Sequence, residues 1–82
     1  QPLSISIVAC FEPIKSISKK QRELMLQNKV RPTKKPDIDN IIKAVLDALN
    51  GIAYKDDTQV VQVMAQKKYA DKAFVEVAIC EL

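Results

Sequence analysis

Residues 37–51, DIDNIIKAVLDALNG, predict the central helix of the fold. Their apolar positions step by three or four, which places them on one face of an α-helix and leaves the opposite face polar. Asp37 follows Pro36 and is a natural N-cap, while Asn50-Gly51 supplies a glycine that can end a helix with positive φ. The sequence therefore predicts an amphipathic helix from Asp37 or Ile38 to Asn50. Its apolar positions are Ile38, Ile41, Ile42, Val45, Leu46 and Leu49.

Strand patterns lie on both sides of this helix. Residues 3–11 alternate apolar and small polar side chains, as a half-buried strand does, and Pro13 ends the pattern. Residues 59–69 and 73–82 are also rich in strand-forming residues, and we expect these two segments to form an antiparallel hairpin. The order predicts an α+β fold, in which one main amphipathic helix packs on a face of a small mixed or antiparallel sheet.

The segment between the first strand and the central helix is strongly basic. Residues 15–35 hold eight basic residues and one acid, Glu23, a net charge of +7, whereas the remainder holds five basic and nine acidic residues, a net charge of −4. Ser18 and Gln21 fit a capping box that opens a short helix over 18–28, and prolines favour an extended loop after it. The segment is either an arm that binds a nucleic-acid backbone or a solvated linker. Its basic residues are Lys15, Lys19, Lys20, Arg22, Lys29, Arg31, Lys34 and Lys35.

The 82 residues are enough for a single domain with a thin core. The chain does not begin with Met and a strand pattern starts at Leu3, so we expect an N-terminal part of the natural protein to precede it. Nothing resembles a membrane span or a signal peptide, and the expected location is the cytoplasm. Cys10 and Cys80 are expected to be buried free thiols. Histidine is absent, which excludes Ser-His and Cys-His catalysis and histidine-bound zinc.

Two pairs of acids flank the central helix. Asp37 and Asp39 lie at its start, and Asp56 and Asp57 follow it after a short turn. If the chain returns antiparallel to the helix, these carboxylates share one pocket, and such oxygen ligands select Mg²⁺ or Mn²⁺. Taken singly, each acid has a simpler interpretation as a helix cap, a first-turn acid or a turn residue.

Lys43 lies four residues after Asp39 on the same side of the helix. It either forms an i, i+4 ion pair with that acid or reaches a phosphate.

The spacing of these residues resembles a known family. The pattern D-x-D-N-x-x-K-x-x-x-D-A-L over residues 37–49, followed by D-D-x-Q-V over 56–60, is similar to that of the RusA family of Holliday junction resolvases, which phages and prophages frequently carry. The resemblance implies a Mg²⁺-dependent homodimeric endonuclease that acts in DNA recombination and repair, nicking two opposed strands of a four-way junction. By position, Asp37, Asp39 and Asp57 match the catalytic acids and Lys43 the essential lysine, while Asp56 matches a neighbouring acid.

The sequence departs from the family in two places. The family has an N-terminal strand and helix that we expect to be missing from residues 1–82, and the basic segment is longer here. Two other functions stay open: a nuclease that acts on other branched DNA, and a DNA-binding module without catalysis whose acids are only caps and turns.

Overall fold

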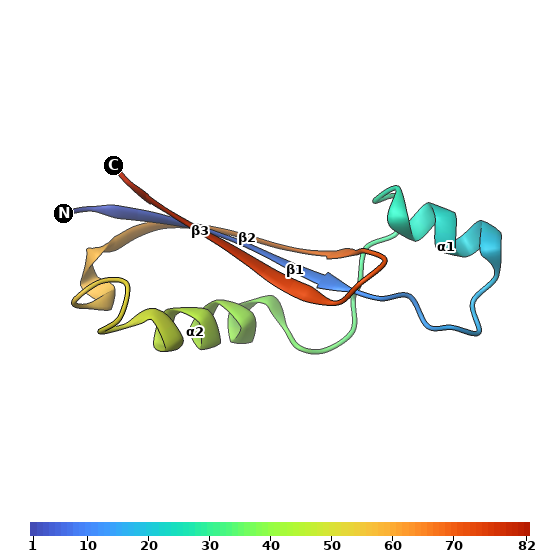
Figure 1. Cartoon of the computed structure of the whole chain (residues 1–82), viewed down its shortest axis with the longest axis horizontal. Coiled ribbons are helices and arrows are strands. Elements are labelled where there is room, and N and C mark those ends of the chain that lie inside the picture. The colour runs from blue at the N-terminus through green and yellow to red at the C-terminus, as the bar shows by residue number, and fades with distance from the viewer.

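The structure is a computed structural model that describes all residues from 1 to 82. It consists of three strands and two α-helices, with a short 3₁₀-helix before the second strand (Figure 1). The order along the chain is β1 (Leu3–Phe11), α1 (Lys19–Leu26), α2 (Ile38–Leu49), η1 (Asp57–Gln59), β2 (Val60–Tyr69) and β3 (Phe74–Glu81). The predicted α+β class with a mixed sheet is confirmed.

The sheet has the order β2-β1-β3, with β1 in the middle. β1 pairs in parallel with β2 and antiparallel with β3. The predicted hairpin of the last two strands is therefore wrong, because β2 and β3 lie on opposite edges. The physical reason is burial: Ile5 and Ile7 of β1 are 0% and 1% exposed, which only a strand with a neighbour on each side and a helix above it achieves.

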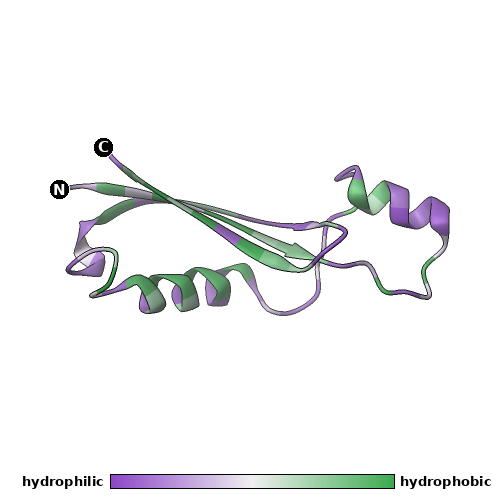
Figure 2. Ribbon diagram, in the orientation of Figure 1, coloured by the Kyte–Doolittle hydropathy of each residue, from purple (hydrophilic) through white to green (hydrophobic).

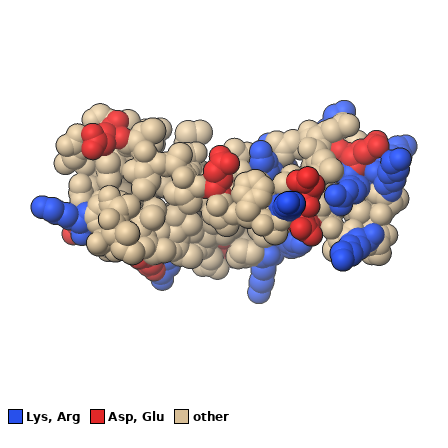
Figure 3. Space-filling view, viewed as in Figure 1, with Lys and Arg blue, Asp and Glu red and all other residues tan.

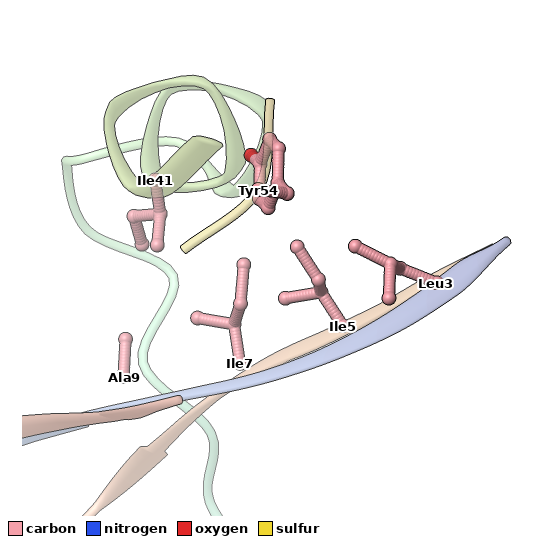
Figure 4. Close-up of a cluster of buried hydrophobic side chains, with 6 residues drawn as sticks. All are labelled: Leu3, Ile5, Ile7, Ala9, Ile41 and Tyr54. Atoms are coloured by element: carbon pink, nitrogen blue, oxygen red, sulfur yellow. The ribbon is translucent and has the colours of Figure 1, made fainter. Parts of the chain in front are cut away.

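The hydrophobic core lies between α2 and one face of the sheet. The apolar stripe of α2 faces the strands and its polar residues face outward (Figure 2). Figure 4 shows the side chains of β1 in a row beneath Ile41 of α2 and Tyr54 of the following turn. α2 leaves β3 less covered, because Val75, Val77 and Ile79 stay 56%, 38% and 39% exposed. The buried cluster consists of Leu3, Ile5, Ile7, Ala9, Ile41 and Tyr54.

Local signals set the ends of both helices. Ser18 Oγ accepts a hydrogen bond from the backbone N–H of Gln21 at 3.2 Å, so it caps α1 as predicted. Gly51 has a φ of 79°, which ends α2 in the conformation that favours glycine. Neither helix is long and apolar enough to cross a membrane.

The two cysteines differ in burial. Cys10 is a buried free thiol as predicted, but Cys80 is exposed. The expectation for Cys80 is wrong because β3 is an edge strand, and Cys80 pairs there with Ser4, whose side chain points away from α2.

Candidate functional site

The first acid pair opens α2 with free carboxylates. Asp37 occupies the N-cap position with extended backbone, yet its side chain makes no capping hydrogen bond. Asp39 lies in the first turn, and both side chains are exposed. Their charge is favoured by the positive end of the helix dipole. Both carboxylates are therefore available to a ligand.

The second acid pair surrounds the start of η1 and its two members differ. Asp56 caps η1, because its Oδ1 accepts from the N–H of Thr58 at 3.4 Å and Gln59 Oε1 accepts in return from the N–H of Asp56 at 3.3 Å. Asp57 has one carboxylate oxygen, Oδ1, that is buried and has no hydrogen-bond partner. Leaving a buried charged acceptor without a partner costs free energy, so this oxygen suits a cation or a donor from outside the chain.

Tyr54 connects the second acid pair to the core. It is 7% exposed, and its hydroxyl donates to the backbone carbonyl of Leu46 at 3.1 Å. Burial raises the pKa of Tyr54, and the carboxylates of Asp57 and, more weakly, Asp47 raise it further. The sequence pattern showed Tyr54 only as part of a short apolar run, since nothing local reveals its contact with α2.

The two acid pairs lie at opposite ends of α2. The expectation that they share a pocket within one chain is wrong, because no group of three or more such side chains gathers around a common point. The twelve residues of α2, at 1.5 Å per residue, separate its ends by about 18 Å. The chain does return antiparallel to α2 through β2, but Asp57 lies before the first residue of that strand (Figure 1).

The far end of β2 instead contacts the loop that precedes α2. Lys67 Nζ donates to the carbonyl of Lys34, just before the first acid pair. Arg31 Nη1 donates to Gln66 Oε1 at 3.2 Å and to the carbonyl of Lys67 at 3.4 Å. Both contacts tie the loop before α2 to β2. No local sequence signal marks Lys67, because more than 30 residues separate it from its partner.

The other basic residues spread over one end of the molecule. Lys19 and Lys20 on α1 are exposed and Arg22 is partly exposed. Figure 3 shows lysine and arginine side chains gathered over the end that holds α1. Lys43 is exposed on α2, between the two acid pairs.

Comparison with known proteins identifies the family. The family model described as Endodeoxyribonuclease RusA matches residues 1–80. The chain belongs to the RusA family. The predicted resemblance is thereby confirmed over nearly the whole chain.

A curated relative matches almost the whole chain, but its name states no function. The chain is 43% identical over 83 residues to the uncharacterized protein YqaN of Bacillus subtilis (strain 168), covering 99% of this chain and 58% of YqaN. The chain thus spans somewhat more than half the length of this relative. No solved structure matches.

The chemistry of the RusA-family acids suits a hard divalent cation. Each offers carboxylate oxygen, the ligand type that Mg²⁺ prefers, and Asp57 Oδ1 lacks any other partner. The described chain alone brings too few of them to one place to enclose the ion. Asp37 and Asp39 lie at one end of α2, and Asp57 lies beyond the other.

Proposed function

We propose that this protein is a Mg²⁺-dependent endonuclease that resolves Holliday junctions by paired symmetric nicks. The observation that carries the proposal is the RusA-family match over residues 1–80, which includes both acid pairs and Lys43. The unpartnered Oδ1 of Asp57 supports it, because a buried polar atom normally has a hydrogen-bond partner.

We infer that two copies complete the site. In a homodimer whose α2 helices lie antiparallel across a two-fold axis, the start of each helix faces the end of the other. Asp37 and Asp39 of one copy then meet Asp57 of the other, which resolves the separation of about 18 Å within a chain. The arrangement yields two equivalent sites, and a four-way junction offers two equivalent strands.

The residues take distinct roles in this proposal. Asp37, Asp39 and Asp57 would hold Mg²⁺ or Mn²⁺, with Asp56 beside them positioning the turn. A bound divalent ion supplies an activated water and stabilises charge on the phosphate. Lys43, exposed on α2, would contact the phosphate, and the basic residues of the arm would bind the DNA backbone.

A second candidate function is a DNA-binding module without catalysis. The capping role of Asp56 favours it, since that acid already has a structural use. A nuclease that acts on other branched DNA differs from the first proposal only in its substrate.

Cleavage of a synthetic four-way junction and of a linear duplex of the same sequence tests the function. We expect Mg²⁺-dependent paired nicks in the junction only. Asp39→Asn should lower the rate by at least about 100-fold, since even outer-shell changes at metal sites cost about 10–100-fold. Asp71→Asn, which changes an exposed acid in the β2–β3 turn, is the matched control and should leave the rate unchanged.

Each alternative gives a different result in this assay. Binding without cleavage at any Mg²⁺ concentration contradicts the enzyme and supports the module. Cleavage of flaps or forks at the same rate as junctions supports the branched-DNA nuclease.

A further inference from the structure

One side chain, that of Gln59, holds the turn that carries the second acid pair. Its Oε1 accepts hydrogen bonds from two backbone N–H groups, that of Lys55 at 2.8 Å and that of Asp56 at 3.3 Å. The backbone N–H of Gln59 donates in turn to the carbonyl of Asp56 at 3.0 Å. Asp57 lies inside the loop that these three bonds close, so Gln59 fixes the backbone from which the Asp57 carboxylate projects.

A further contact ties Gln59 itself to the sheet. Its Nε2 donates to the carbonyl of Gln1 at 3.4 Å, just before β1. Gln1 Nε2 donates to Glu81 Oε2 at 3.0 Å, at the end of β3. β2 begins directly after Gln59, and both chain termini lie at this end of the molecule (Figure 1). The network therefore joins the acid turn to the ends of all three strands and leaves it fewer conformations than a free loop has.

The same bonds leave one oxygen of Asp57 without a partner in the chain. Aspartate side chains in turns commonly accept hydrogen bonds from nearby backbone N–H groups. Here Gln59 accepts from two of these groups, and Asp56 Oδ1 accepts from the N–H of Thr58 at 3.4 Å. Asp57 Oδ1 is buried and has no partner. Other acceptors thus occupy the neighbouring donors, and this oxygen keeps its lone pairs for a ligand from outside the chain.

Glutamine suits this position better than an acid does. A capping box admits either glutamate or glutamine at the third helical position. Glutamate would place a third carboxylate beside Asp56 and Asp57, and like charges disfavour one another's ionised form. The neutral amide of Gln59 accepts the same hydrogen bonds and also donates through Nε2, which an ionised carboxylate cannot do. Gln59 thus orders the turn without adding a charge to it.

We propose that Gln59 is a positioning residue for Asp57, and that it acts through the backbone of the turn and not by contact with the metal. The inference rests on the proposed nuclease function, in which Asp57 would hold Mg²⁺ or Mn²⁺. Replacing a partner that orients a metal ligand changes metal affinity by about 10–100-fold. A glutamine that only capped η1 would instead change the stability of the fold and leave metal affinity as it was.

Mn²⁺ binding to the metal-free protein tests this role. Gln59→Met keeps the length of the side chain but removes its hydrogen bonds. We expect it to raise the dissociation constant of Mn²⁺ by about 10–100-fold, measured from the EPR signal of free Mn²⁺. Gln59→Asn is shorter by one methylene, so it should not reach the N–H of Lys55 and should weaken Mn²⁺ binding likewise. Gln62→Met makes the same change at an exposed glutamine of β2 and is the matched control.

Two further measurements separate positioning from DNA binding and from a missing contact. In the metal-free protein, hydrogen exchange at the Lys55 amide, followed by NMR, should be faster in Gln59→Met than in Gln62→Met, because the acceptor is gone. In junction cleavage, Gln59→Met should need about 10–100-fold more Mg²⁺ for half of the maximal rate. Its affinity for the junction in EDTA should match that of the unaltered protein.

Each outcome decides between the roles. If the unaltered protein cleaves junctions but Gln59→Met binds Mn²⁺ as tightly as Gln62→Met does, Gln59 is only a cap, and the proposal is wrong while the nuclease function stands. If Gln59→Met does not fold, Gln59→Asn takes its place in this comparison, and equal Mn²⁺ binding has the same meaning. If the unaltered protein neither binds Mn²⁺ nor cleaves junctions, the nuclease function and the positioning role fail together.

Discussion

Tyr54 links the buried core to the acid pair that follows α2. Because burial and then Asp57 raise its pKa, the hydroxyl stays protonated in the folded protein at a pH where the unfolded chain has begun to ionise. The folded state then binds more protons than the unfolded state, so its stability falls as the pH rises from the ordinary tyrosine pKa toward the raised one.

Tyr54→Phe should separate the hydrogen bond from the ionisation. At neutral pH we expect a loss of about 0.5–1.5 kcal/mol in the free energy of unfolding, for the bond to the carbonyl of Leu46. Above about pH 10 the variant should lose less stability than the unaltered protein, so the difference between them narrows. Urea unfolding at several values from pH 7 to 11 measures both effects.

Asp57→Asn is the companion variant to Tyr54→Phe. It removes one cause of the raised pKa and leaves burial, the larger cause, in place. The stability that Asp57→Asn loses at alkaline pH should therefore be closer to the loss in the unaltered protein than the loss in Tyr54→Phe is. Parallel pH profiles for the unaltered protein and Tyr54→Phe would contradict a buried, protonated hydroxyl.

At the scale of elements, local signals predicted the helices but not the strand pairing. The cap at Ser18 and the positive φ at Gly51 depend on residues within one turn, which a sequence displays directly. The alternation of apolar and polar side chains shows that residues 60–69 and 74–81 are strands. The same alternation is expected whether these strands pair with each other or with β1. The choice depends on which strand buries more apolar surface, and that is a property of the assembled sheet.

The positions of the acid pairs, like the strand pairing, could not be predicted from local sequence signals. Their identities and spacing were sufficient to name the family, but their positions in space follow from the length of α2 and from where β2 begins. The antiparallel return was expected correctly, and its far end brings Lys67 to the carbonyl of Lys34 in the loop before α2. Contacts between residues more than 30 positions apart leave no trace in a local pattern.

Helix α1 should act as an electrostatic arm. Replacing the exposed Lys19 and Lys20 together by glutamine removes two charges without touching the sheet. If each contacts a phosphate of duplex DNA, the slope of log affinity against log salt should fall by about 0.9 per lysine, so by about 2 for the pair. Affinity for junction and linear duplex should weaken alike, because backbone contacts carry no sequence or branch information.

Glu23→Gln on the same helix is the control for this arm. It removes the one acid of α1, so affinity should rise or stay equal and the slope should not decrease. An unchanged slope in Lys19→Gln/Lys20→Gln would show that α1 is a solvated linker.

At the scale of the whole molecule, the chain is elongated and thinly packed. Its extents are 47 × 20 × 17 Å, and only ten of 82 residues are buried. One helix covers one face of three strands, which leaves apolar side chains of β3 in contact with solvent. The proposed dimer would bring the separated acids together, and it would also bury this apolar surface if the second copy covered β3.

Mixing two inactive variants tests whether the site spans two copies. Asp39→Asn and Asp57→Asn should each be inactive alone, because every composite site then lacks one acid. After refolding together in equal amounts, half of the dimers combine the two variants, and each such dimer holds one intact site and one doubly altered site. About a quarter of all sites should regain activity, and these dimers should nick only one strand of a junction.

Mixing Asp37→Asn with Asp39→Asn restores no site, because both acids come from the same end of α2. If sites instead formed within one chain, neither mixture would recover, and the separation of the acid pairs along α2 would require another explanation.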